Sequence, residues 1–414
     1  MKKLLTIFII LFLFTVNLQA EEEPLEKTHF SMKRRTVEFG FANVDFGIAN
    51  NLIKFSDLFK PKMVLDFSKL DKNFNLGFDV NVRPFFININ IKNRWGLGFD
   101  FGNTKVYGSL DIASNLLNLR HSEKGGDSFG VGASVFVDVG IPVFFKIKNV
   151  WETRDLRINI RPAFFVAAAY MSPSMKYTYR DGDKGTLIEI DYGITAYAPF
   201  SLDFGQGGLN NLNIGSALGF DFSVGADYPL FKFLDIGVQF INIPLKSSVL
   251  ENYLKMSGKV SVDSSDVTIE DLINNTDNAF GKFVNLPDGF TQTYGSNSGK
   301  RFYRPFKMLF TANYRPFTTP ILFISPTFGF SYNQIFVKKA AVEFGVKVGC
   351  NLANIFTTTI GVCYEDKMWK NGIDFLLNLY AFELGFGVAM QSQHFVQSWQ
   401  GKGLRANVSI KFGF

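Results

Sequence analysis

Cysteine, histidine and charge are all scarce in this sequence of 414 residues. Two Cys and three His are too few for a zinc cluster or a disulfide framework. Asp, Glu, Lys and Arg together make up only 19% of the chain, and the 43 basic residues nearly balance the 37 acidic ones. This composition excludes an intrinsically disordered chain and gives no reason to expect a nucleic-acid partner.

A long hydrophobic run is also lacking beyond the first residues. Lys2 and Lys3 precede an apolar stretch over residues 4–16, and Ala20 is a small residue just before an acidic segment. This order is typical of a secretory signal peptide over residues 1–20, because the apolar stretch is shorter than the roughly 20 residues that a membrane anchor needs. The sequence thus predicts export, with residues 21–35 as a periplasmic leader.

The longest uncharged stretch in the rest of the chain, residues 316–337, contains Pro316, Pro320 and Pro326. Each proline removes a backbone donor and would break a helix. The sequence therefore excludes a membrane protein built from helices.

What the chain does have is apolar residues at every second position, most clearly at its end. There Leu404, Ala406, Val408, Ile410, Phe412 and Phe414 alternate with Arg405, Asn407, Ser409, Lys411 and Gly413. Because side chains alternate across a strand, one face of such a strand is apolar and the other is polar. Similar alternation recurs around residues 74–82, 129–139, 156–166, 214–224, 342–348 and 382–388.

This alternation predicts an all-β fold, and the abundance of phenylalanine, 48 residues, indicates where the apolar faces lie. A soluble β-sandwich would alternate as well, but strands of about ten residues with a Phe-rich face suit a tilted crossing of a bilayer. In lipid the sheet must close, since every unpaired backbone group at an open edge would cost several kcal/mol. We therefore predict a transmembrane antiparallel β-barrel over residues 36–414, with about 14 or 16 strands.

One long polar segment, residues 246–301, interrupts this pattern. Within it, Ile269, Leu272, Ile273 and Phe280 follow helical spacing. A connection of this length is usually functional or disordered. We interpret the segment as a long outer loop or a plug lobe with a short helix.

The ends of the chain resemble those of bacterial outer-membrane β-barrel proteins. In that class the barrel assembly machinery reads a C-terminal aromatic residue with apolar residues at alternate preceding positions, here Phe414, Phe412, Ile410, Val408 and Ala406. The resemblance implies insertion into the outer membrane, with membrane lipid and the assembly machinery as partners. The use of Phe, Asn and Lys is similar to that of uncharacterised spirochaete-like outer-membrane proteins, and fatty-acid-channel barrels have a similar length.

No catalytic motif accompanies the predicted barrel. His29, His121 and His394 lie in segments without a known catalytic spacing, although a nucleophile needs its base within hydrogen-bond reach. The sequence contains no Gly-x-Ser-x-Gly, phosphate-binding Gly-rich loop or His-Glu-x-x-His motif. We predict neither an enzyme nor a bound cofactor. Cys350 and Cys363 are expected to be separate thiols, because a predicted hairpin places them roughly 26 Å apart.

The predicted inward face carries charges of both signs, and these are Arg157, Arg161, Glu189, Asp191, Asp221, Glu343, Lys347, Arg405 and Lys411. On the lipid side each charge would cost about 2–4 kcal/mol at mid-depth, so we expect these residues to line the lumen. A barrel of about 14 strands or more has a lumen too wide for side chains to fill, unless a segment plugs it. The sequence thus favours a pore or transporter for small solutes, and an ion-pair network that fills a structural barrel is the other interpretation.

Two further functions stay open at this point. A carrier of hydrophobic compounds, like the fatty-acid channels, would need an apolar track in the lumen, which the inward residues do not show. A surface adhesin or structural barrel would use the 246–301 lobe.

The dipeptide Arg-Pro recurs at Arg83, Arg161, Arg304 and Arg315. Proline within a sheet belongs at strand ends, edges or bulges, so these pairs can mark strand ends at the membrane interface. The alternative is a basic cluster in the lumen.

Overall fold

The computed structural model of the protein describes residues 36–54, 74–92, 94–112, 129–151, 154–182, 185–202, 213–263, 291–296, 298–317, 321–333, 337–352, 355–366, 368–379 and 381–414. The predicted signal peptide, the leader at 21–35 and the predicted helix at 269–280 lie outside these residues. Within them, no helix is long and apolar enough to cross a membrane.

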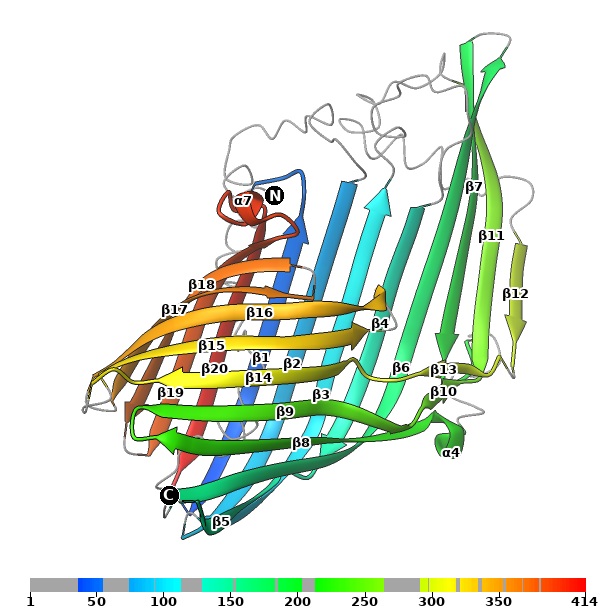
Figure 1. Ribbon diagram of the computed structural model, residues 1–414. Coiled ribbons are helices and arrows are strands. Elements are labelled where there is room, and N and C mark those ends of the chain that lie inside the picture. The colour runs from blue at the N-terminus through cyan, green and yellow to red at the C-terminus, as the bar shows by residue number, and fades with distance from the viewer. Residues whose placement is uncertain are drawn as a thin grey trace.

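Fourteen antiparallel strands form a closed ring (Figure 1). In ring order they are β1 (Val37–Asn50), β2 (Phe74–Ile91), β3 (Trp95–Ile112), β4 (Phe129–Gly140) continued by β5 (Val143–Trp151), β6 (Arg154–Gly182), β8 (Leu218–Phe231), β9 (Leu234–Lys246), β14 (Phe306–Tyr314), β15 (Leu322–Asn333), β16 (Val337–Leu352), β17 (Phe356–Glu365), β18 (Met368–Leu379), β19 (Phe382–Ser392) and β20 (Gly403–Gly413). The pairing of β20 with β1 closes the ring. The predicted barrel is therefore confirmed, at the lower of the two expected strand numbers.

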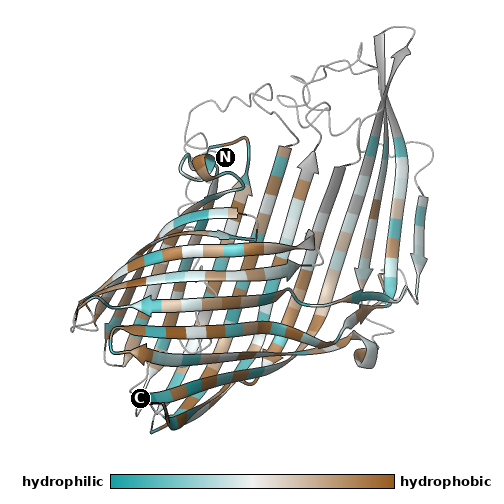
Figure 2. Ribbon diagram, viewed as in Figure 1, coloured by the Kyte–Doolittle hydropathy of each residue, from teal (hydrophilic) through white to brown (hydrophobic). Residues whose placement is uncertain are grey.

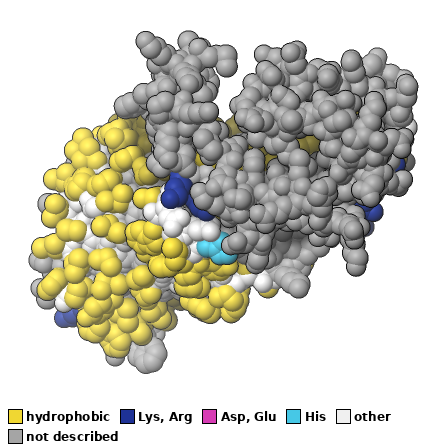
Figure 3. All heavy atoms as spheres, turned by 90° about the horizontal axis from the view of Figure 1, so that it is seen from above, with side chains coloured by type: hydrophobic (Ala, Val, Ile, Leu, Met, Phe, Trp, Pro, Cys, Tyr) yellow, Lys and Arg dark blue, Asp and Glu magenta, His cyan; other side chains and the backbone are white. Residues whose placement is uncertain are grey.

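The alternation read from the sequence separates an inner from an outer face. Along β20, every second residue from Gly403 to Gly413 is buried, and these include Arg405 and Lys411. Outward residues are apolar and half exposed, such as Phe328 and Ile360 (47% and 60%). Figure 2 shows this alternation as bands along the strands, and Figure 3 shows hydrophobic side chains over much of the described surface. Such a face is stable against lipid, so the barrel spans a membrane.

The wall divides at β6. One edge of β6 pairs with β8 as far as Val166, opposite Leu218, and then with β7 (Gly185–Ala198) from Tyr170 onward. Beyond β7 follow β11 (Asn252–Asp263) and β12 (Thr291–Gly295), which rise as a separate ribbon in Figure 1. We call the stretch of β6 between Val166 and Tyr170 the fork.

A β-bulge explains the fork. On its other edge β6 pairs with β4, and Val135 faces Ala169 while the next residue, Phe136, faces Ala167. The residue between them is therefore extra, and an extra residue bends a strand and increases its twist. The bend directs the upper half of β6 away from the ring, toward β7.

The segment 246–301 differs from the predicted loop in its described parts, which are mainly strands. They are β10 (Ser248–Leu250), β11, β12 and β13 (Lys300–Phe302), and β10 pairs with β13. The reason is visible in β11, where Leu254, Met256, Val260 and Val262 occupy alternate positions and find β7 as partner. Residues 264–290, which include the predicted helix, are not described.

Candidate functional site

The inner wall carries an irregular belt across β2, β3 and β4. Pairing of β2 with β3 omits Arg83 and Pro84, and pairing of β3 with β4 shifts register between Asp100 and Asn103. Gly102 lies at the centre of this shift with a φ of +69°, a conformation that disfavours side chains with a Cβ. Such bulges redirect side chains, and here they direct charged groups into the lumen.

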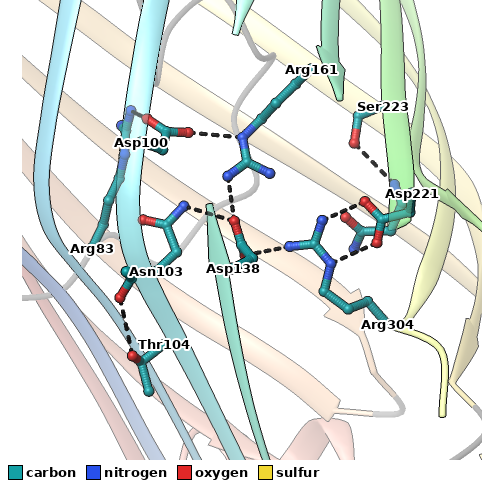
Figure 4. A network of polar contacts seen from close by, with 11 residues as sticks. Arg83, Asp100, Asn103, Thr104, Asp138, Arg161, Asp221, Ser223 and Arg304 are labelled. Carbon is teal, nitrogen blue, oxygen red and sulfur yellow. Dashed lines mark hydrogen bonds and ion pairs between the residues drawn. The ribbon is translucent and has the colours of Figure 1, made fainter. Parts of the chain in front are cut away.

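These charged groups form one continuous chain of ion pairs, the Arg–Asp network. In order, its members are Arg83, Asp100, Arg161, Asp138, Arg304 and Asp221 (Figure 4). Arg161 Nε donates to Asp100 Oδ2 at 2.8 Å and its Nη2 to Asp138 Oδ1 at 2.5 Å, while Arg304 Nε donates to Asp221 Oδ2 at 2.7 Å. Three arginines and three aspartates alternate, so the network is neutral as a whole.

The network is dry. The carboxylates of Asp100, Asp138 and Asp221 are 0%, 3% and 1% exposed, and the side chain of Arg304 is 3% exposed. Buried charges are stable only when they are paired, because desolvation costs several kcal/mol per ion. The alternation of signs meets this requirement along the whole network.

Neighbouring residues are shaped to hold the guanidinium groups. A Cβ at Gly140 would lie 2.4 Å from Arg161 Cζ, so the absence of a side chain there lets Arg161 cross β4. The guanidinium of Arg83 lies over the ring of Phe86, with Cζ 3.7 Å from the ring centroid. Arg304 lies 5.4 Å from the ring of Phe165. Stacking on rings suits the planar guanidinium and adds to its ion pairs.

An apolar cluster lies beside the network at the fork. This fork cluster consists of Phe136, Phe165, Ala167, Leu250 and Phe302, with Tyr107, Tyr170 and Tyr197 packed against it. The rings of Tyr170 and Phe302 are 4.7 Å apart, and those of Phe136 and Phe165 are 6.2 Å apart. Phe136 and Phe165 occupy the inward positions of β4 and β6, so the polar lumen contains an aromatic surface.

Ser248 joins the two sides of the fork. Its hydroxyl accepts a hydrogen bond from Ala167 N–H at 2.9 Å and donates one to the carbonyl of Ala217 at 2.5 Å. Ala217 is the last residue of α4 (Ile214–Ala217), directly before β8. The hydroxyl thus takes the place of a ladder bond where β6 leaves β8, and it holds the β10–β13 pair in the fork.

A second set of ion pairs lies on the inner face of the ring around β16–β20. Arg405 binds Asp45 and Asp79, and Lys411 Nζ lies 3.0 Å from Glu383 Oε1. These bonds join β20 to β1, β2 and β19. On the same inner face, Lys307 lies between Glu343 and Glu365, with Nζ–O distances of 3.5 and 2.7 Å.

The predicted lumen residues fall into several groups. Arg161 and Asp221 meet in the Arg–Asp network, whereas Glu343, Arg405 and Lys411 belong to the second set. Lys347 lies 3.9 Å from Asp374 and is less buried, and Arg157 stacks on the ring of Phe144 at 4.0 Å.

Asp191 lies apart from these groups. It is on β7, outside the ring, where its exposed carboxylate is 3.8 Å from Lys259 Nζ on β11. Glu189 is also on β7, opposite Ser261 of β11, and its side chain is not described.

Sequence reasoning missed several members of the site. Asp100 lies within the register shift on β3, where counting alternate positions fails. Phe136 and Phe165 occupy the same alternate positions of their strands as the polar residues Asp138 and Arg161. This shared position was the signal in the sequence that these two aromatic residues face the lumen. Of the four Arg-Pro pairs, the structure brings Arg83, Arg161 and Arg304 together as the cluster hypothesis expected, although aspartates neutralise them; Arg315 pairs with Asp235 instead.

The two cysteines are free, as predicted. Cys350 on β16 faces Thr358, whereas Cys363 on β17 faces Gly345. They therefore lie five ladder positions apart, and a disulfide cannot span about 17 Å.

The C-terminal residues lie on the outer face of β20. Ala406, Val408, Ile410 and Phe412 alternate with buried inward residues, and Phe412 stacks on Phe39 of β1 with ring centroids 5.5 Å apart. Phe414 is 69% exposed. The role of these residues as an assembly signal stays a prediction.

No family model and no curated protein matches the chain. Solved structures with a similar fold include the toluene transporter TbuX of Ralstonia pickettii, at 10% identity and a TM-score of 0.42 over 91% of this chain and 89% of that chain. The CymD monoaromatic hydrocarbon channel has 8% identity and a TM-score of 0.47 over 95% of this chain and 94% of that chain. A FadL homologue of Pseudomonas aeruginosa has 9% identity and a TM-score of 0.39, over 91% and 88%.

Proposed function

We propose that this chain is an outer-membrane transporter for small hydrophobic compounds, which it takes up at the fork. Its location follows from the fold, because closed barrels with a lipid-facing apolar band are the membrane-spanning form of β-structure. The observation that carries the choice of substrate is the fork cluster, in which aromatic and aliphatic side chains pack together on an inner wall whose other inward positions are mostly polar or charged.

An apolar compound gains free energy at this surface that a polar solute does not. Burial of apolar area contributes about 25 cal/mol per Å², and rings add about 0.5–1.5 kcal/mol when they pack edge-to-face or offset. Leu250 and Phe302 belong to β10 and β13, which pair with one another as a two-stranded sheet and not with the strands of the ring. A compound of similar size can replace these two side chains against Phe165 and the tyrosines.

The Arg–Asp network suits the same function. Its charges are paired and buried, so it offers no hydrated path at the level where β2, β3, β4 and β6 are irregular. It also holds Arg304, three residues from the end of the polar segment, against β4 and β8. The network thereby holds the fork in position while a bound compound replaces Leu250 and Phe302 in the fork cluster.

A hydrated polar pore is the second candidate, and a specific observation favours it. On the β16–β18 side the inward charges are less buried, with Lys347 and Asp374 21% and 37% exposed at 3.9 Å from one another. Water and small ions would use that side of the lumen.

Flux measurements with purified protein in vesicles test the proposal. Vesicles that contain the protein should take up a monoaromatic hydrocarbon faster than protein-free vesicles do, measured before passive entry is complete. Phe165→Ala, which removes a ring that the bound compound would contact, should weaken the saturable component about tenfold, which corresponds to a loss of about 1.4 kcal/mol of ring contact. Phe328→Ala, which removes an equal ring from the lipid-facing surface, is the matched control and should leave uptake unchanged.

Three results would contradict the proposal. Hydrocarbon uptake equal to that of empty vesicles would exclude the substrate class. Conductance steps in planar bilayers that persist in Phe165→Ala, without hydrocarbon uptake, would favour the polar pore. Binding to a host surface that is lost when residues 264–290 are deleted, again without uptake, would favour an adhesin.

A further inference from the structure

The outer face of β18 contains one polar residue among apolar ones. Its outward positions are Trp369, Asn371, Ile373, Phe375, Leu377 and Leu379, which pair with the outward residues of β19. Asn371 is nevertheless only 6% exposed, because its side-chain amide donates a hydrogen bond to the hydroxyl of Ser398. Ser398 is the last residue of α7 (Phe395–Ser398), in the connection between β19 and β20. The connection therefore folds down over the outside of the barrel and covers Asn371.

A second polar contact holds α7 in this position. Ser392, the last residue of β19, is also outward and only 1% exposed, and its hydroxyl lies 3.5 Å from Gln397 Oε1. A polar group that faces lipid without a hydrogen-bond partner would cost several kcal/mol. Both contacts lower this cost on the outer wall, because each gives a polar side chain there a partner. They would not be needed if α7 covered the mouth of the barrel, where water reaches polar groups.

The exposed side chains of α7 and of Trp399, the residue that follows it, are large and apolar. Phe395, Val396 and Trp399 are 45%, 67% and 55% exposed. The ring of Phe395 lies 4.8 Å from Trp369, which in turn lies 5.4 Å from Phe344 on the outer face of β16. Phe395, which also lies 6.3 Å from Trp399, thus joins this apolar group to the lipid-facing surface of the barrel.

Among the described residues, two lysines, Lys402 and Lys54, lie at the end of the barrel where α7 lies. Lys402 follows α7 and donates from Nζ to the carbonyl of Asn51 at 2.8 Å. Burial and the nearby charge of Lys54 lower the pKa of Lys402. The three longest connections of the ring, between β9 and β14, between β6 and β8 and between β1 and β2, all leave from this end, whereas no connection between the described strands at the other end is longer than the seven residues between β14 and β15. Short turns face the periplasm in such barrels, so α7 belongs to the outer leaflet side.

We propose that α7 is a membrane-interface anchor, in which Phe395, Val396 and Trp399 insert at the boundary between acyl chains and headgroups and Lys402 contacts lipid phosphate. Amphipathic helices lie in this plane with aromatic residues at the boundary. The occupant of the exposed surface is therefore lipid. The inference is independent of the transported compound.

Tryptophan fluorescence of the full chain in vesicles tests the anchor. A variant with Trp95→Phe, Trp151→Phe and Trp369→Phe reports on Trp399 alone. In vesicles of phosphatidylcholine and phosphatidylglycerol, its emission should be blue-shifted and protected from iodide. Lipids brominated near the headgroup end of the chain should quench it more than lipids brominated near the chain terminus.

Val396→Asp in the same background provides the contrast. The added charge should move Trp399 toward water, with a red-shifted emission and restored iodide quenching, while heat-modifiable migration on a gel shows that the barrel is intact. Iodide quenching of Trp399 as strong as for free tryptophan in the parent variant, with no effect of brominated lipid, would overturn the proposal. A nitroxide on Val396→Cys, in a Cys350→Ser and Cys363→Ser background, gives a second reading that does not need the tryptophan substitutions. It should be accessible to oxygen and shielded from a water-soluble nickel complex, and the reverse accessibility would also overturn the anchor.

Discussion

Replacement of Asp138 by asparagine gives a direct test of whether the Arg–Asp network is dry. Asp138 accepts bonds from Arg161 and Arg304, and from the side-chain amide of Asn103 at 3.3 Å. The isosteric asparagine side chain keeps one acceptor but turns a donor toward the second guanidinium. The variant loses a charge-assisted hydrogen bond and leaves one buried positive charge without a counterion.

The magnitude follows from these two losses. A hydrogen bond to a charged group contributes about 1.5–3 kcal/mol, and breaking a buried ion pair on one side costs about 3–5 kcal/mol in all. We expect Asp138→Asn to lower the free energy of unfolding by about 3–5 kcal/mol, measured by urea titration of the protein refolded in lipid vesicles. Asp235→Asn is the matched control, since its 2.7 Å pair with Arg315 is about one third exposed, and it should cost at most about 1 kcal/mol.

A double variant makes the test sharper, because the second substitution is expected to increase the free energy of unfolding rather than to lower it further. Adding Arg161→Met to Asp138→Asn removes one charge of each sign and leaves the Arg83–Asp100 and Arg304–Asp221 pairs intact. The double variant should therefore be more stable than Asp138→Asn alone, by about 1 kcal/mol or more. If Asp138→Asn costs no more than the Asp235→Asn control and the second substitution only adds to the loss, water reaches the network. The inference of a sealed belt would then be wrong.

Three other predictions concern single features of the wall. Ser248→Ala should lower the free energy of unfolding by about 1–3 kcal/mol, because it leaves two buried backbone groups at the fork without a partner. The amide hydrogens of the fork should then exchange faster than in the parent protein, and an unchanged exchange rate at the fork would contradict this prediction. Gly140→Ala should cost about 1–3 kcal/mol in the same urea titration, since Arg161 is held by two carboxylates and cannot yield to the new methyl group. An unchanged midpoint would show that Arg161 does not cross β4. Cys350 and Cys363 should both react with maleimide after unfolding without prior reduction, and a gel shift on adding reductant would contradict separate thiols.

Several features of this protein are readable in the sequence because they depend on neighbours along one strand. The period-two pattern that ends at Phe414 determines which side chains face lipid, and the cost of open edges in lipid determines that the sheet closes. For the same reason the inward positions of Arg161, Asp221, Glu343, Arg405 and Lys411 could be predicted by counting alternate residues.

The fork, the network and the anchor depend on partners that the local pattern does not specify. Arg304 is 166 residues from Asp138 and 83 from Asp221, so only the closed ring brings them together. The bulge at Ala167–Ala169 looks like ordinary strand in the sequence, yet it decides that β6 pairs with β8 below and β7 above. Likewise Asn371 is polar on an apolar face, and only the folded position of Ser398 supplies its hydrogen bond. One strand specifies its own two faces, whereas the choice of partner is a property of the whole barrel.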